Sequence, residues 1–338
     1  MKFLRTLGYF LFLFLFCLSI LEILYKSQLW DFYSAELRAF NTPSILQNTS
    51  KKPFLGVFGD SFSATNDPYV NTLRDSLTSF CIVNHAIPGT GILETNLIAS
   101  QRMKQFPASV VIYQIYIGND LVNIRKQPNW STLPFLKNCY YGITNYLKLP
   151  EWLNYKLSQK AFFYKFKRQT LDLNPRYQDE EGFEPEAFST YEKQLLRAEP
   201  TLIEETVLVE GNRKKDVQVL YQNLDTFVEK VTKTAQKIYI LVYPHAMQVN
   251  DYYHHKYLKM GFSTPHKAAF MDENYPFVRH LTQHFANNKQ VIVINPLKII
   301  RKNDSPSHRT FFENDFHASS WGQQIVGAEL AKIIAANQ

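Results

Sequence analysis

The sequence predicts a three-layer α/β domain of flavodoxin-like type with a central parallel sheet of five strands. Short apolar runs rich in β-branched and aromatic residues recur along the chain. Longer segments with helical spacing of apolar residues separate these runs. The composition, 45% hydrophobic and 20% charged, is that of a folded protein and excludes a wholly disordered chain.

The five expected strands are short and apolar on both faces, as strands of a buried parallel sheet are. They are residues 54–58, 81–83, 110–117, 238–243 and 291–294. Helical spacing is clearest in residues 216–236 and 321–336. A length of 338 residues allows roughly two domains, or one large α/β domain with an insertion.

The N-terminus predicts one transmembrane helix. Residues 6–21 carry no charge and are mostly Phe and Leu, and together with 23–25 they give about 20 apolar residues, enough to cross a bilayer. Lys2 and Arg5 precede this stretch, which favours a cytoplasmic N-terminus and an extracytoplasmic (periplasmic or extracellular) domain on a single-pass cell-membrane protein. A cleavable signal peptide is the alternative, but the residues after the apolar stretch are not the small ones that a signal peptidase requires.

The expected organisation is a signal-anchor over residues 1–25, a connector over 26–52, and an α/β domain over 53–338 that contains a mainly helical insertion at 125–215. The net charge of +7 is concentrated in the first half of that insertion, because residues 125–168 hold nine Lys or Arg and one acid. Aromatic residues are interleaved with these bases. The pattern fits a solvated helical face, or contact with anionic lipid headgroups or an anionic glycan; nucleic acid is not an expected partner.

Three cysteines are too few for a disulfide scaffold and lack the spacing of zinc ligands. The chain also has no P-loop and no H-E-x-x-H motif, and we expect no metal and no cofactor. An exported domain could join Cys81 to Cys139, but Cys81 lies in an apolar run and also fits a plain buried residue.

Polar loops follow the first three expected strands. Five of the 12 glycines, at positions 56, 59, 89, 91 and 118, lie in or just after these strands. Because the carboxyl ends of parallel strands meet at one edge of a sheet, the loops 59–63, 84–89 and 118–120 should lie together there. A fourth polar segment, Asn314-Asp315-Phe316-His317, precedes the last helix.

These four segments, in this order, resemble the four motif blocks of the SGNH (GDSL) hydrolase superfamily, and with the N-terminal helix they resemble its membrane-anchored members linked to polysaccharide O-acetylation. The resemblance covers residues 53–122 and 238–338 and leaves the insertion unaccounted for. It implies a catalytic triad of Ser61, His317 and Asp315. It also implies an oxyanion hole formed by the backbone N–H groups of Ser61 and Gly89 and the side-chain amide of Asn119.

The chain departs from the family pattern twice. Gly118 directly precedes Asn119, where the family usually has one residue between them. The acid of the last block lies two residues before His317, whereas the usual position, three before, holds Asn314. The second departure makes Asp315 the weakest triad member, so a Ser–His dyad stays an alternative. His85 and His245 also follow strands and are candidate substrate contacts.

The expected function is a membrane-anchored serine esterase or O-acyltransferase that works through an acyl-serine intermediate, on acetyl esters of extracytoplasmic glycan. One alternative is a lipid esterase or thioesterase at the membrane surface, and another is a non-catalytic glycan-binding or scaffold protein. The expected partners are the membrane, a glycan or other ester substrate, and a membrane protein that donates the acyl group.

Overall fold

The structure is a computed structural model that describes residues 2–41, 51–65, 68–124, 139–140, 142–157 and 199–337. It divides into two compact units: Met1–Ser34 with Lys126–Leu171, and Ala35–Arg125 with Asp172–Gln338. The expected insertion at 125–215 is therefore shared between the units. We call the first the N-terminal unit and the second the sheet unit.

The sheet unit contains the five parallel strands that the sequence predicts. They are β1 (Phe54–Phe58), β2 (Cys81–Asn84), β3 (Ala108–Tyr116), β4 (Lys237–Tyr243) and β5 (Val291–Ile294). Their spatial order is β2-β1-β3-β4-β5, and every neighbouring pair is parallel. The chain therefore turns in one direction from β1 to β2 and in the other from β2 to β3. This reversal at β1 and β3 is the point where open α/β sheets form their binding sites.

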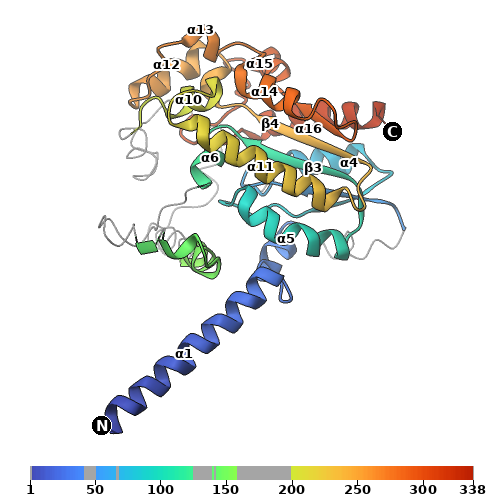
Figure 1. Cartoon of the computed structure of the whole chain (residues 1–338). Helices are drawn as coiled ribbons and strands as arrows, with labels where there is room; N and C mark the ends of the chain where they lie inside the picture. The colour runs from blue at the N-terminus through green and yellow to red at the C-terminus, as the bar shows by residue number, and fades with distance from the viewer. Residues whose placement is uncertain are drawn as a thin grey trace. The chain divides into compact units, whose positions relative to one another are not determined.

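Helices cover both faces of the sheet (Figure 1). Right-handed crossovers in opposite directions put the helices after β1 and β2 on opposite faces. On one face α4 (Tyr69–Ser76) packs against α16 (Ser320–Ala336), and on the other α5 (Ile92–Gln105) packs against α11 (Arg213–Val231). The predicted α/β architecture and the two most regular predicted helices are thus confirmed, with α11 starting and ending a few residues earlier than expected.

The core lies between the sheet and these helices. Phe227 of α11 packs against Phe58 of β1, with ring centroids 5.3 Å apart, and against Tyr113 of β3, at 5.0 Å. All three side chains are fully buried. Burial of a side chain of this size contributes on the order of 1.5–3 kcal/mol, so such contacts fix the helices on the sheet and hold the strand ends in place.

Shorter elements complete the sheet unit or lead into it. They are α2 (Ser34–Ala39), α6 (Asp120–Asn123), α10 (Leu202–Leu208), η3 (Ala246–Gln248), α12 (Asp251–Lys259), α13 (Lys267–Phe270), α14 (Pro276–His284) and α15 (Leu297–Asn303). Between α15 and α16 the chain forms a hairpin-like loop, residues 304–319, closed by an antiparallel bridge between Phe311 and Ala318. We call this loop the C-terminal hairpin.

In the N-terminal unit, α1 (Lys2–Ser27) is a single helix of 26 residues. Its segment Arg5–Ser27 is long and apolar enough to cross a membrane, a property that a signal sequence shares. The described part of the insertion in this unit is helical at 149–157. Cys17, Cys81 and Cys139 are all free thiols.

Candidate active site

Ser61 lies in the turn that directly follows β1. We call residues 59–63 the nucleophile turn. The turn continues the pairing of β1 with the segment after β2, because Ile87 donates its N–H to the Gly59 carbonyl over 3.1 Å. A Cβ on Gly59 would lie 2.6 Å from Oε1 of Gln114 and 2.9 Å from Oγ of Ser63. A larger residue at this position would meet the Gln114 and Ser63 side chains that hold the turn, which favours glycine.

Neutral side chains from neighbouring elements hold the nucleophile turn. Oε1 of Gln114, on β3, accepts from the Asp60 N–H (3.3 Å) and from the Ser63 hydroxyl (3.0 Å). Nδ2 of Asn84, at the end of β2, donates to the Ser63 carbonyl (2.6 Å). Gln323, on α16, donates to the Phe62 carbonyl (3.2 Å). The position of Ser61 is thus set from three elements of the fold.

The structure joins Ser61, His317 and Asp315 in one chain of hydrogen bonds. Nε2 of His317 lies 2.7 Å from the Ser61 hydroxyl oxygen, and Nδ1 of His317 contacts Oδ1 of Asp315. A carboxylate can only accept, so Nδ1 carries the ring proton and Nε2 of the neutral ring accepts from Ser61. This is the arrangement in which a histidine can take the proton of a serine hydroxyl.

The two-residue spacing between Asp315 and His317 is compatible with this geometry. The same Asp315 oxygen also accepts from the backbone N–H of His317, over 2.8 Å, which closes a tight local turn. Phe62, next to the nucleophile, packs its ring 5.1 Å from the His317 ring. Asp315 therefore orients the imidazole, and the aromatic neighbour limits its tilt.

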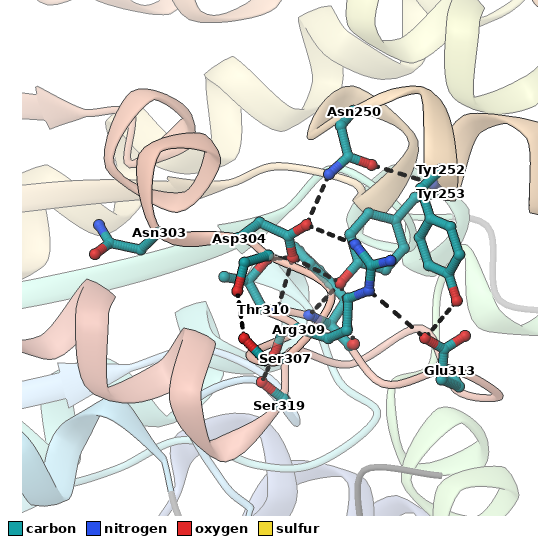
Figure 2. A network of polar contacts seen from close by, with 12 residues as sticks. Asn250, Tyr252, Tyr253, Asn303, Asp304, Ser307, Arg309, Thr310, Glu313 and Ser319 are labelled. Atoms are coloured by element: carbon teal, nitrogen blue, oxygen red, sulfur yellow. Dashed lines mark hydrogen bonds and ion pairs between the residues drawn. The ribbon is translucent and has the colours of Figure 1, made fainter. Parts of the chain in front are cut away.

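The C-terminal hairpin that carries His317 is held by a buried carboxylate, that of Asp304 (Figure 2). Asp304 accepts from Nδ2 of Asn250 (2.7 Å), the Tyr253 hydroxyl (2.9 Å), the N–H and hydroxyl of Thr310 (2.9 Å each) and the Arg309 guanidinium (3.1 Å). Its side chain is 1% exposed. A buried charge with five donors ties the start of the hairpin to α12 and its cap, and to Arg309 and Thr310 further along the hairpin.

A second charged group holds the far side of the hairpin. Lys256 of α12 forms a buried ion pair with Glu313 and also donates to the Glu313 carbonyl over 3.0 Å. The Tyr252 hydroxyl donates to the same carboxylate (2.6 Å), and burial together with Glu313 raises the pKa of Tyr252 to about 12. The Arg309 guanidinium stacks 3.6 Å above the Tyr252 ring, as Figure 2 shows for the two side chains.

The two other expected oxyanion-hole residues lie in loops that are tied to each other. Gly89 is exposed and has φ +70°, a left-handed conformation that favours glycine. Asn119 begins α6, accepting with its carbonyl from the N–H of Asn123 (2.9 Å). Nδ2 of Asn123 donates to the Thr90 carbonyl (3.3 Å), which connects α6 to the Gly89 loop. The Asn119 side chain interacts with Asp60, the residue before the nucleophile.

Two buried carboxylates lie behind the site. Burial raises the pKa of Asp60, against the effects of the Phe62 N–H, the His317 charge and the side chains of Asn119 and Gln114. Burial and the charge of Asp60 raise the pKa of Asp120 well above its usual value, although the Tyr116 N–H donates to it over 2.5 Å. Neither carboxylate contacts the Ser61 hydroxyl, and both bond to backbone N–H groups, so their role is to shape the loops.

The two other histidines named from the sequence lie elsewhere. His85 is buried between Phe58 and Phe106, with ring centroids 4.7 and 5.7 Å away, so it is not brought to the triad. His245 is fully buried, and its ring lies 5.9 Å from that of Phe316, in the C-terminal hairpin. Nδ1 of His245 accepts from the Met247 N–H over 3.2 Å. Among the residues that the structure describes, no group of three or more His, Cys, Asp or Glu could hold a metal ion.

Several positioning residues were not identified from the sequence. Gln114 had a detectable signal, since it is the single amide in the apolar and aromatic run of residues 110–117. Asp304, Tyr253 and Lys256 had none, because their role depends on contacts between segments that are about 50 residues apart in the chain.

No protein-family model and no curated protein matches this chain. Among solved structures, it is similar to a GDSL-like lipase from Bacteroides thetaiotaomicron, with 10% sequence identity, coverage of 91% of this chain and 98% of that chain, and a TM-score of 0.43. It is also similar to a family 3 carbohydrate esterase from Clostridium thermocellum, with 10% identity, coverage of 84% and 100%, and a TM-score of 0.40. At this level of similarity, function has to be argued from the residues of the chain itself.

Proposed function

We propose that this protein is a serine esterase of the SGNH type. The observation that carries the proposal is the Ser61–His317–Asp315 hydrogen-bond chain at the carboxyl ends of the sheet, at its topological switch point. Ser61, Asp315 and His317 are all partly exposed, whereas Asp60 and Phe62, on either side of Ser61, are buried. A substrate can therefore reach the three reacting side chains.

The geometry supports a two-step acyl transfer. The Ser61 oxygen attacks the ester carbonyl carbon while its proton passes to Nε2 of His317. The tetrahedral oxyanion is stabilised by the N–H groups of Ser61 and Gly89 and the Asn119 amide, and His317 then gives its proton to the leaving alcohol. Water, activated by the same imidazole, releases the acid from the acyl-serine. Asp315 stabilises the imidazolium that forms in each step.

The proposed substrates are acetyl esters of a glycan outside the cytoplasm, on a chain anchored by α1. The length and apolar character of α1 support the anchor. If a sugar hydroxyl replaces water in the second step, the same acyl-serine makes the protein an O-acetyltransferase, which would need an acyl-donor protein in the membrane. An esterase for lipids or thioesters is the second candidate, favoured by the same apolar helix.

The test of a reactive nucleophile is covalent labelling with a fluorophosphonate. We expect labelling of the wild-type chain and none of Ser61→Ala. A folded wild-type protein that is not labelled would contradict the esterase proposal and favour a binding or scaffold role.

The test of the substrate is mass spectrometry of acetylated oligosaccharides and long-chain acyl esters incubated with the full chain. Free acetate identifies an esterase, and acetate on an added oligosaccharide identifies a transferase. Turnover of long-chain esters alone would replace the glycan proposal with the lipid one.

A further inference from the structure

The N-terminal unit contains an acid at an unusual place. Glu22 is the one acidic residue of α1, and it is the one charged residue between Thr6 and Tyr25. Its side chain is almost buried, at 10% exposure. An ionisable residue in such a helix is costly unless it is paired, and it therefore indicates a specific role.

Both oxygens of Glu22 bind the insertion. Oε1 accepts from the Lys148 N–H over 2.7 Å, and Oε2 accepts from the Leu149 N–H over 2.8 Å. These N–H groups lie at the start of the helix at 149–157. A carboxylate there accepts from N–H groups that have no partner within the helix, and it interacts favourably with the helix dipole. Lys26 pairs with Glu22 at 3.0 Å and donates to the Tyr146 carbonyl at 2.7 Å. The end of α1 is thus clamped to the turn before this helix.

Aromatic packing reinforces the clamp. The ring centroid of Phe32 lies 5.1 Å from that of Tyr25, on α1, and 5.1 Å from that of Trp152, on the helix at 149–157. The hydroxyls of Tyr25 and Tyr33 are 2.9 Å apart and buried. The turn and helix at 142–157, which we call the interfacial segment, therefore form one folded body with the end of α1.

Large apolar side chains of this body nevertheless face outward. Tyr146 is 78% exposed, and Leu147, in the clamped turn itself, is 44% exposed. Further exposed apolar side chains of the body are Ile23, Leu29, Trp30, Ile143, Leu153 and Leu157. A cluster of exposed apolar side chains beside the end of a membrane-length helix indicates a surface that contacts a protein or a membrane. Tyr and Trp are the residues that membrane interfaces favour.

We propose that the interfacial segment lies on the bilayer that α1 crosses, in contact with anionic lipids. This inference rests on the proposed anchor. Tyr146 and Leu147 then enter the boundary between headgroups and acyl chains, and Glu22 sets the depth at which they do so. The charge of the surrounding sequence fits this partner, because residues 125–168 hold nine bases and one acid, and anionic headgroups attract bases.

The test uses the full chain in bilayers that contain phosphatidylglycerol, with the three native cysteines replaced by serine. A nitrobenzoxadiazole label is attached at Tyr146→Cys or, in a second protein, at Phe14→Cys, near the middle of α1. Lipids with a nitroxide either near the headgroup or deep in the acyl chain quench the label according to its depth. We expect the label at 146 to lose most fluorescence to the shallow nitroxide and the label at 14 to the deep one.

Two further variants test the clamp. Glu22→Ala should abolish the shallow quenching at 146 and keep the deep quenching at 14. Ser27→Ala is the matched control, because the Ser27 hydroxyl donates only to carbonyl oxygens of α1 itself, at 23 and 24, and it should change neither. Quenching at 14 without quenching at 146 would overturn this inference and leave the anchor intact. Absence of quenching at both positions would overturn the anchor as well.

Discussion

The two loops that meet at the candidate active site are held in place by different physical means. The nucleophile turn extends directly from β1, and the bonds that reach it from the neighbouring strands and α16 come from neutral amides such as Gln114. The C-terminal hairpin extends from no strand of the sheet and is fixed by two buried charged groups, Asp304 and the Lys256–Glu313 pair. A loop with a strand behind it needs few additional bonds, whereas a loop without one needs strong bonds.

This difference predicts how much stability the protein loses when a supporting residue of either loop is substituted. Loss of a neutral hydrogen bond costs on the order of 1 kcal/mol, whereas loss of one partner of a buried charged group costs several times as much. Substitutions that remove a reacting atom should abolish activity in either loop. Substitutions of the supporting residues should destabilise the protein more in the C-terminal hairpin than in the nucleophile turn.

The largest effect is expected from the reacting atoms. Ser61→Ala and His317→Gln should each lower kcat/KM for an ester substrate by about 10⁴–10⁶-fold, because the two side chains act as a unit. Urea unfolding should show nearly unchanged stability, since both side chains are partly exposed. Activity within tenfold of the wild type for either variant would contradict the triad.

The next effect comes from Asp315. Asp315→Asn should lower kcat by about 10³–10⁴-fold, because an amide no longer fixes the proton on Nδ1 of His317. Adding Asn314→Asp to that variant restores an acid three residues before His317. We expect no rescue, because the observed geometry depends on an oxygen that also accepts the His317 N–H. Rescue in steady-state kinetics would show that the usual family spacing is available to this hairpin.

The supporting residues should differ in their effect on stability. Asp304→Ala should lower the free energy of unfolding by about 3–5 kcal/mol, because it removes the buried charge that accepts from five donors, among them the Arg309 guanidinium. Gln114→Leu should lower it by about 1–3 kcal/mol, since it removes the acceptor of two neutral donors. Urea titrations of both variants and of wild type measure the difference. Equal losses of unfolding free energy in the two variants would contradict the proposed difference between the two loops.

The smallest effect concerns pH. Burial lowers the pKa of His245 to about 3, and burial together with Arg102 lowers that of His85 well below its usual 6.5. The unfolded chain takes up a proton at each histidine below about pH 6.5, which the folded chain does not, so stability falls as the pH drops from there towards the folded pKa.

Each histidine contributes a slope of up to about 1.4 kcal/mol per pH unit. His85 lies beside the strand that leads to the nucleophile turn, and His245 lies beside the C-terminal hairpin. His85→Phe and His245→Phe should each remove one histidine's share of the slope of unfolding free energy with pH. Urea unfolding at several pH values between about 4.5 and 6.5 measures it. An unchanged slope in either variant would mean that this histidine is protonated in the folded chain.

The features that the sequence predicted correctly are local ones. Each strand is a short apolar run, and Ser61 follows such a run, so both can be identified without knowledge of any distant residue. The Asp304 carboxylate gave no signal, because an isolated acid in a polar loop looks the same whether it is solvated or buried with five donors. The contact of Glu22 with the insertion was hidden in the same way, since 126 residues separate Glu22 from Lys148.

The hydrogen bond between Ser61 and His317 joins residues 256 positions apart. During translation, Ser61 is synthesised early and His317 near the end of the chain. Helix α16, which packs against α4, follows His317. During most of its synthesis the chain therefore carries a serine that nothing can deprotonate. On the proposed mechanism, esterase activity would begin only when the final segment has docked, and unfinished or C-terminally truncated chains would be inert towards esters.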